Sequence, residues 1–320
     1  MDRIQILHCR PSRARDLTAF LRIGAVILAG CALTSPRRSL ADTFPNLGGA
    51  GNYAVLGVGG TIVVSSDFEV YQSATVVTGN VGLGPYSNWT HGIDATITGR
   101  LDYDTTDTLP AITGTIGGGT HQMPMSSIVA DALAASTTAS LLTPTQTFST
   151  LTEDQIIVGN GGLNVIDITG DVTLKKTLTL QGTASDQFVF QLTANDATSA
   201  KTLTLSGVIM SLVGGVTAGN VLWDLNGTGG QLVITSGATV YGTFLAPDRS
   251  ITVDHGIITG RVIGGGSPDP NNQNFLSIHS SSQITSPDAV PEPSEVAALS
   301  AMSLMGLGGL FHFRRRAKAV

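Results

Sequence analysis

Between Leu47 and Ile284 the chain consists mainly of short apolar runs that alternate with threonine or another polar residue and end at Gly, Asn or Asp. In segments 171–180 and 201–205 the leucines fall on one side of an extended strand and the threonines on the other, because successive side chains of a strand point to opposite faces. Short strands with frequent turns are therefore predicted. Similar Thr-apolar units recur about every 20 residues, which favours a solenoid of stacked coils, although so degenerate a repeat leaves a β-sandwich open.

One segment breaks this pattern. Met125 to Leu142 is rich in Ala and Leu, has apolar residues at helical spacing and lies between Pro124 and Pro144. These features predict a single helix. A lone apolar helix among strands is expected to lie along a sheet. The predicted fold class is therefore all-β, with one long α-helix packed alongside.

The N-terminal end has the pattern of an export signal. Five arginines precede the apolar run Ile23 to Leu33, and a small-x-small cleavage site ends at Ala41. Residues 1–41 are therefore predicted to be a secretory signal peptide. The segment Leu28 to Cys31 also resembles a bacterial lipobox, which would make Cys31 a lipidated N-terminus. Both alternatives export the chain.

The C-terminal end, residues 287–320, has three parts in a fixed order. A Pro-Glu-Pro motif is followed by an apolar stretch from Val296 to Phe313 and then by a basic cluster; the motif and the cluster comprise Pro291, Glu292, Pro293, Arg314, Arg315 and Arg316. This order resembles the PEP-CTERM sorting tail of Gram-negative bacteria. The resemblance implies an exosortase-type partner and a transient membrane anchor on an exported, cell-surface or extracellular protein. A plain single-span anchor remains the alternative, since the stretch is just long enough to cross a bilayer.

The remaining domain, residues 42–286, is acidic and low in charge. Only 12% of the whole chain is charged, and between Asp42 and Pro291 there are six Lys plus Arg against 19 Asp plus Glu. Such a balance argues against nucleic acid and anionic membrane surfaces as partners, because phosphate contacts need clustered cations. Both cysteines, Cys9 and Cys31, lie in the signal region, so cleavage at Ala41 leaves no thiol for a disulfide or for catalysis.

Four stretches of the domain, in order, resemble a known family. They are 47–56 (LGGAGNYAVL), 78–84 (TGNVGLG), 186–192 (DQFVFQL) and 219–225 (GNVLWDL), with the predicted helix between the second and the third. This order resembles the ice-binding-like domain of secreted microbial proteins, which implies a right-handed β-solenoid with one long helix alongside. Segments 240–247, 256–262 and 274–276 also resemble a bacterial surface domain of the choice-of-anchor type.

The family resemblance implies a flat, largely uncharged face of outward threonines as the binding surface. The candidates for this array are Thr173, Thr177, Thr179, Thr202, Thr204, Thr235, Thr239, Thr243, Thr252 and Thr259. Threonine is also common on any strand, and several charged residues near these positions would interrupt a flat surface; they are Lys175, Lys176, Lys201, Asp248, Arg249 and Asp254. The ligand is therefore expected to be an extended surface, ice or exopolysaccharide. An adhesive or structural matrix protein without ice binding is the alternative.

Patterns for other chemistry are weak. Asp102, Asp104 and Asp107 lie within six residues, which leaves calcium binding open beside the interpretation as a solvated acidic loop. The sequence has no His-Glu-x-x-His and no Gly-x-Ser-x-Gly motif, so no catalytic, metal or cofactor site is predicted. The expectation is a non-enzymatic protein, with a polysaccharide lyase or hydrolase as the remaining alternative.

Overall fold

The computed structural model describes residues 42–66, 74–108, 112–192, 201–266 and 273–287, and these residues are mostly β-strand with one α-helix. The predicted signal peptide, 1–41, lies outside them, as does all but the first residue of the predicted sorting tail, 287–320. Among the residues described, no helix is both long enough and apolar enough to span a membrane.

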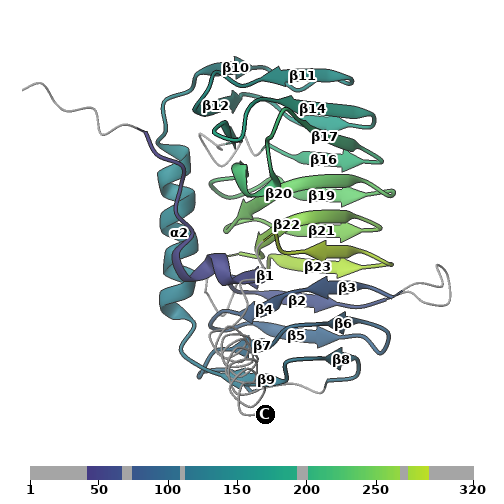
Figure 1. The fold of residues 1–320 in the computed structure, drawn as a ribbon. Helices are drawn as coiled ribbons and strands as arrows, with labels where there is room; N and C mark the ends of the chain where they lie inside the picture. The colour runs from purple at the N-terminus through teal and green to yellow at the C-terminus, as the bar shows by residue number, and fades with distance from the viewer. Residues whose placement is uncertain (1–41, 67–73, 109–111, 193–200, 267–272, 288–320) are drawn as a thin grey trace, which may run out of the picture. The chain divides into compact units, whose positions relative to one another are not determined.

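The strands belong to stacked coils (Figure 1). Thr177–Gln181 (β14), for example, pairs in parallel with Gln155–Val158 (β11) on one side and with Ile209–Val213 (β17) on the other. Every other strand pairing in the described part of the chain is also parallel. The predicted solenoid of stacked strands is therefore present, and the β-sandwich alternative, which requires antiparallel pairs, is wrong. The right-handed winding stays a prediction, in line with the usual hand of parallel β connections.

The coils have three faces. The helix face contains β10 (Gln146–Phe148), β12 (Leu163–Ile168), β15 (Gln187–Gln191), β18 (Val221–Asp224), the C-terminal halves of β20 (Thr239–Ala246) and β22 (Ile257–Gly264), β1 (Tyr53–Gly57), β4 (Asn80–Leu83), β7 (Leu101–Tyr103) and β9 (Thr120–Gln122). The uncharged face contains β11, β14, β17, the N-terminal halves of β20 and β22, β24 (Gln283–Thr285), β3 (Val76–Thr78), β6 (Thr96–Ile97) and β8 (Thr115–Ile116). The third face is called the mixed face because it has both threonines and charged side chains. It is a separate sheet of β13 (Val172–Leu174), β16 (Leu203–Ser206), β19 (Leu232–Thr235), β21 (Ile251–Asp254), β23 (Phe275–His279), β2 (Thr61–Val64) and β5 (Asn88–His91). Two short 3-10 helices, η1 (Gly48–Asn52) and η2 (Ala218–Asn220), precede β1 and β18.

The beginning and the end of the described chain meet within the stack. Strand β1 pairs with β22, β2 pairs with β23, and β3 pairs with β24. In Figure 1 the purple N-terminal coil accordingly lies against the yellow C-terminal coil. All three faces are thus continuous across the junction between early and late coils.

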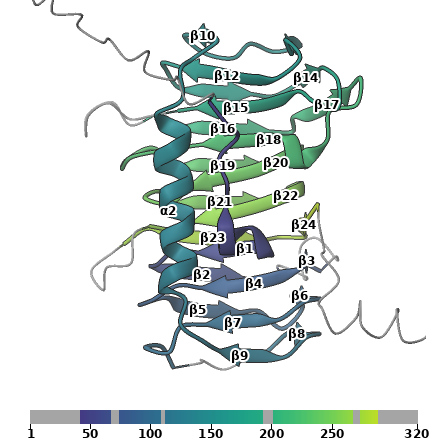
Figure 2. The same ribbon diagram turned by 60° about the vertical axis from the view of Figure 1, so that its left-hand side comes forward.

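The predicted helix is confirmed as α2 (Ser126–Ser140), which lies along the helix face (Figure 2). Its buried side chains are mainly alanines, and small side chains let a helix approach a sheet closely. The apolar seam between them comprises Val129, Ala132, Ala135 and Ala139 of the helix with Leu56, Val165, Val189, Leu222, Leu245 and Ile263 of the strands. Burial of this seam supplies a hydrophobic attraction that holds the helix against the coils.

The interior of the coils is filled by inward Leu, Ile and Val side chains of all three faces. Phe190, Trp223 and Phe244 occupy matching positions on successive coils and stack, with ring centroids 3.9 Å apart for the first pair and 5.9 Å for the second. Trp223 is fully buried, so it belongs to the core and does not form a stacking platform for sugars.

Candidate functional site

The uncharged face presents two rows of outward side chains, since the inward and outward positions alternate along each strand. In register across the coils, the first row is Thr177, Ile209, Thr239, Ile257, Gln283, Val76, Thr96 and Thr115. The second row has an upper part, Ile156, Thr179 and Ser211, and a lower part, Tyr241, Thr259, Thr285 and Thr78. A short third row, on β11, β14 and β17 alone, is Val158, Gln181 and Val213. Strand spacing of about 4.8 Å makes these rows a regular two-dimensional array.

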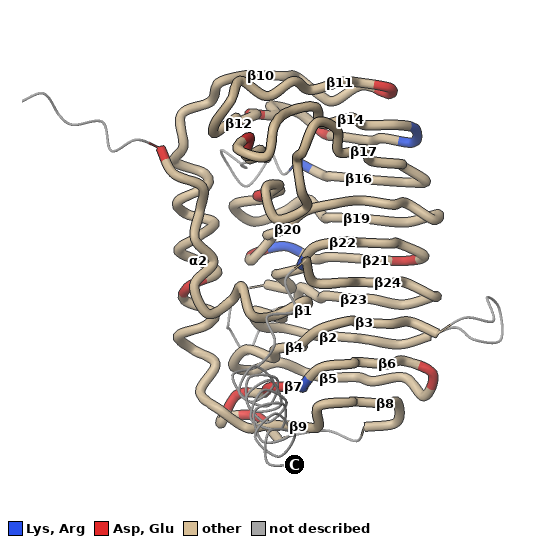
Figure 3. Tube along the Cα trace, in the orientation of Figure 1, with Lys and Arg blue, Asp and Glu red and all other residues tan. Residues whose placement is uncertain are grey.

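Large aliphatic side chains are exposed on this face. Those with 42% to 59% of their surface exposed are Ile156, Val158, Ile209, Val213 and Ile257. The strand segments that form the face contain no Asp, Glu, Lys or Arg. Figure 3 shows the charged positions mainly at turns between strands. An open surface of aliphatic groups and hydroxyls without charge is unusual on a soluble protein and indicates a binding surface.

The mixed face has a similar central row but different surroundings. The row is Thr173, Thr204, Val233, Thr252, Ser277, Val63 and Thr90. Beside it, Asp254 Oδ1 lies 2.8 Å from Nδ1 of His255 and 3.6 Å from Nδ1 of His279. Exposed Asp171 and Lys175 flank the first strand of this face. Charged groups hold their own hydration shells, so the mixed face is a less uniform surface than the uncharged face.

The structure distributes the predicted threonine array over three faces. Thr177, Thr179, Thr239 and Thr259 lie on the uncharged face, while those in or next to strands of the mixed face are Thr173, Thr202, Thr204, Thr235 and Thr252. Thr177 and Thr179 therefore share no surface with Thr202 and Thr204. Thr243 is only 5% exposed on the helix face, so its inclusion in an exposed array was wrong. Alternation identifies outward positions, but it does not distinguish among the three faces of a coil.

Several residues of the uncharged face escaped the sequence analysis. They are the threonines Thr78, Thr96, Thr115 and Thr285 and the aliphatic residues Ile156, Val158, Ile209, Val213 and Ile257. The alternation at 95–99 predicts a strand with Thr96 on its outward side, so this position could have been included in the array. The exposed isoleucines could not, because an Ile in a strand is by default assigned to the core.

Two of the charged residues expected to interrupt the threonine rows are buried. The guanidinium of Arg249 is fully buried and donates to the carbonyl oxygens of Gly227, Leu192 and Asn226 at 2.9, 2.9 and 2.5 Å. It also donates to the carbonyl of Lys201, a residue that is itself buried. Burial lowers the pKa of Arg249 to about 10, partly opposed by Asp224 and Asp248. Neither side chain lies on the uncharged face.

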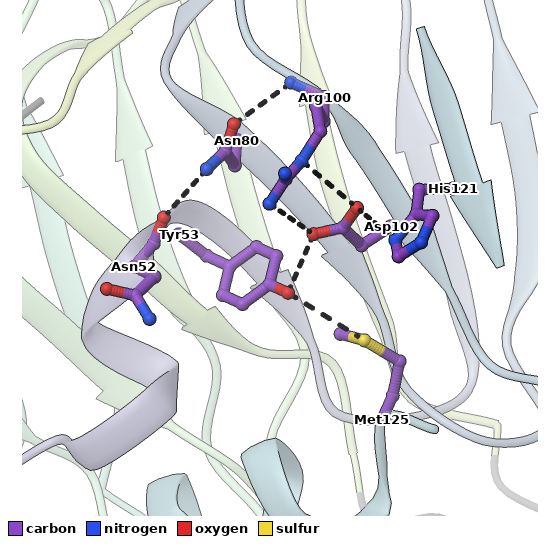
Figure 4. Close-up of polar contacts among 7 residues, drawn as sticks. All are labelled: Asn52, Tyr53, Asn80, Arg100, Asp102, His121 and Met125. Atoms are coloured by element: carbon purple, nitrogen blue, oxygen red, sulfur yellow. Dashed lines mark hydrogen bonds and ion pairs between the residues drawn. The ribbon is translucent and has the colours of Figure 1, made fainter. Parts of the chain in front are cut away.

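The acidic segment 102–107 joins the early coils to the start of α2, and Figure 4 shows the contacts of Asp102 with Tyr53 of β1 and with Arg100 and His121. Asp102 is fully buried, and its Oδ2 accepts a hydrogen bond from the Tyr53 hydroxyl at 2.9 Å. Its Oδ1 lies 3.5 Å from Nε of Arg100 and 3.6 Å from Nδ1 of His121. Burial together with the Asp102 carboxylate raises the pKa of Tyr53, so the phenol keeps its proton and donates.

The other two carboxylates of this segment, Asp104 and Asp107, accept hydrogen bonds from backbone N–H groups. Asp104 accepts from the backbone N–H of Thr106 at 2.9 Å and from that of Met125, just before α2, at 2.8 Å. Burial alone would raise the pKa of Asp104, but these hydrogen bonds outweigh it and lower the pKa. Asp107 accepts from the backbone N–H of Tyr86. The interpretation as a solvated loop was therefore wrong for Asp102 and Asp104, and no group of three carboxylate or histidine ligands within the described ranges could hold a metal ion.

A shallow hollow lies where the mixed face turns toward the uncharged face. Thr235, Ser236, Gly237, Asp254 and His255 line it. Although Asp254 and His255 are in contact, the hollow is open to solvent, whereas enzyme sites usually enclose most of a small substrate. The broad uncharged face is the stronger candidate for a functional surface.

Comparisons with known proteins agree with the fold. Solved structures similar to this chain include an ice-binding protein (LeIBP) from an Arctic yeast, with 24% identity, 79% of this chain and 97% of that chain covered and a TM-score of 0.54. An ice-binding protein from the Antarctic ascomycete Antarctomyces psychrotrophicus has 23% identity over 77% of this chain and 100% of that chain, with a TM-score of 0.51. One from an Antarctic biological consortium has 17% identity over 76% and 91%, with a TM-score of 0.52.

No curated protein matches the chain. The family model described as ice-binding-like matches residues 63–267, which is more than half of the chain and contains most of the described coils. On this evidence the chain belongs to the ice-binding-like family.

Proposed function

We propose that the protein binds ice through the uncharged face. The observation that carries the proposal is the arrangement of threonine and aliphatic side chains in register over successive coils, with no charged residue in the strand segments that form this face. A crystal face of ice is flat and extended, and it offers hydrogen-bonding positions at regular intervals. Threonine hydroxyls can join that lattice, while the methyl and aliphatic groups favour contact because they leave bulk water. Membership of the ice-binding-like family supports the same conclusion.

The proposal implies a non-enzymatic mechanism. An array binds by summing many weak contacts, so it needs flatness and register rather than a catalytic group in an enclosed pocket. The adhesive alternative differs in one respect: it expects no affinity for ice. A polysaccharide-active enzyme would instead depend on individual acid or base groups, such as Asp254 and His255, which are not members of the array.

The protein is further proposed to act outside the cell. The support is the signal-like pattern of residues 1–41 and the order Pro-Glu-Pro, apolar stretch and basic cluster of residues 287–320. An exosortase-type enzyme would act on the motif Pro291 to Pro293 and remove the anchor. Mass spectrometry of the exported protein should then find no residues beyond about Pro293. An intact C-terminal tail on protein exported by a host that has the sorting enzyme would contradict this part of the proposal.

Partition into growing ice tests the binding surface. The purified protein should become concentrated in a slowly growing ice hemisphere, and Thr285→Tyr should remain in the liquid. Thr285 is exposed between Thr259 and Thr78 of the neighbouring coils, so a ring there would hold a flat crystal away from the array. Thr204→Tyr places the same ring in the central row of the mixed face and serves as the control. Equal exclusion of all three proteins from ice would reject the proposal.

A further inference from the structure

The uncharged face is interrupted between β17 and β20. Strands β14 and β17 pair over five residues, from Thr177 with Ile209 to Gln181 with Val213, and β20 and β22 pair over eight. Strands β17 and β20 pair only through Ile209 and Thr239. The strand pairing therefore stops after the first row at this junction.

The interruption has a cause in the backbone. After Val213 the chain turns through Gly214 and Gly215, both with positive φ, and passes through η2 before it enters the helix face as β18. Strand β20 bends instead at Gly242, where φ is +115°, and continues directly into the helix face. A side chain at Gly242 would lie within 2.7 Å of the Val221 carbonyl oxygen, so this position requires glycine. The two strands diverge because residues 214–220 connect β17 to β18, whereas β20 enters the helix face without a connecting segment.

Tyr241 stands at the edge of this interruption. It is the outward residue of β20 in the second row, in register with Thr259, which is followed by Thr285 and Thr78. Above the junction, the second row consists of Ser211 and Thr179. Tyr241 is half-buried against the core, and its ring is much larger than the hydroxyl side chains on both sides.

We infer that Tyr241 divides the uncharged face into two arrays, of which the lower one binds ice. This inference rests on the proposed function and names Tyr241 as the residue that limits how far the ice-binding surface extends. The lower array consists of Thr239, Ile257, Thr259, Gln283, Thr285, Val76, Thr78, Thr96 and Thr115, and the upper array of Ile156, Val158, Thr177, Thr179, Gln181, Ile209, Ser211 and Val213. The lower array has more strands and more threonines. A crystal seated on it does not reach the upper array, because the Tyr241 ring stands in the second row at the junction, where only Ile209 and Thr239 of the first row are paired.

Replacing the ring by a side chain of the neighbouring type should join the arrays. Tyr241→Thr is expected to increase inhibition of ice recrystallisation at least about twofold at equal concentration, because contacts made by a linked second array add to those of the first. Tyr241→Phe keeps the ring and should leave the activity unchanged. Trp223 donates its indole N–H to the Tyr241 carbonyl, and this backbone contact is available in every variant. Tyr241→Val is a second small variant that retains apolar contact with the core, and circular dichroism at the assay temperature verifies folding.

A ring introduced above the junction completes the test. Ser211→Tyr in the parent protein should leave activity unchanged, whereas in the Tyr241→Thr background it should remove the gain. No gain in either folded small variant would overturn the inference, and so would a loss of activity in the parent with Ser211→Tyr, because that result would indicate one continuous array. If the parent protein itself lacks ice activity, the proposed function fails instead.

Discussion

The uncharged and mixed faces are made from the same kind of strand, yet they differ as surfaces. Both have inward leucines, isoleucines and valines and outward threonines in register. The mixed face adds Asp254, His255 and His279 at its margin, whereas the uncharged face adds Ile209 and Ile257 among its threonines. Threonine rows alone therefore do not identify a binding surface. The uncharged face also has charged neighbours, since Lys176 pairs with Glu153 just before β14 and β11. What distinguishes the two faces is the charge inside a strand, Asp254 of β21, and the aliphatic exposure.

The largest difference between the two faces is expected when one charged residue is added to each. The charge should reduce ice activity on the uncharged face and leave it unchanged on the mixed face. Ile257→Lys places an ammonium group in the first row of the uncharged face, and its hydration shell would have to be lost on contact with ice. We expect at least about a tenfold loss of recrystallisation inhibition, which corresponds to about 1.4 kcal/mol. Thr252→Lys makes the same addition on the mixed face, beside Asp254, and should leave activity unchanged. A similar loss in both variants would mean that the faces do not differ in function.

The helix face provides a third surface, apolar like the uncharged face but covered. Ala135 of α2 is buried in the apolar seam, and its neighbour Ala134 is exposed. Ala135→Asp should lower the free energy of unfolding by about 3 kcal/mol, because a carboxylate is placed among apolar side chains, whereas Ala134→Asp should change it by less than about 0.5 kcal/mol. Both variants put the same residue in the same helix, so helix propensity cancels. Equal melting temperatures would mean that α2 is not held by this seam.

A smaller effect on the free energy of unfolding should come from a buried carboxylate of the helix face and should depend on pH. Asp224 is fully buried, and its Oδ1 accepts from the Ser136 hydroxyl of α2 at 2.6 Å. Burial raises the pKa of Asp224 to about 8, although the Ser136 hydrogen bond and the nearby Arg249 oppose the shift. Because the folded state holds this proton more tightly than the unfolded state, the contribution of Asp224 to stability should be greatest below pH 4 and should decrease as the pH rises toward 8.

Asp224→Asn isolates this titration. The variant should be more stable than the parent by more than ~1 kcal/mol at pH 9, with the difference vanishing near pH 4. Chemical unfolding at several pH values measures it. A stability difference that does not change between pH 4 and pH 9 would show that Asp224 has no raised pKa. The uncharged face contains no such buried acid in its strands, so ice activity should follow the pH only through folding.

The elements of the fold could be predicted from sequence more fully than the surface. The helix is marked by its Ala and Leu content between Pro124 and Pro144, and the structure has it at Ser126–Ser140. The strands follow from local alternation, which is a property of neighbouring residues. The recurrence of Thr-apolar units favours stacked coils but leaves a β-sandwich open, so the parallel pairing is established by the structure.

The composition of each face could not be predicted, because it depends on register between distant residues. Thr177 pairs with Ile209 and Thr204 pairs with Val233, and the coils that connect such pairs differ in length. Strand β20 also passes from one face to another at Gly242, so Thr239 is exposed to solvent on the uncharged face while Thr243 is buried on the helix face. Local alternation assigns both threonines to the same side.

Thermal hysteresis of the purified protein tests the central claim most directly. A drop of protein solution holding a small ice crystal is cooled, and the difference between the melting point and the temperature of rapid growth is measured for the parent, Thr285→Tyr and Thr204→Tyr. The account predicts hysteresis and crystal faceting for the parent and Thr204→Tyr, and neither for Thr285→Tyr, with all three proteins folded. Absence of hysteresis in the folded parent, or hysteresis that survives in Thr285→Tyr and is lost in Thr204→Tyr, would contradict ice binding by the uncharged face.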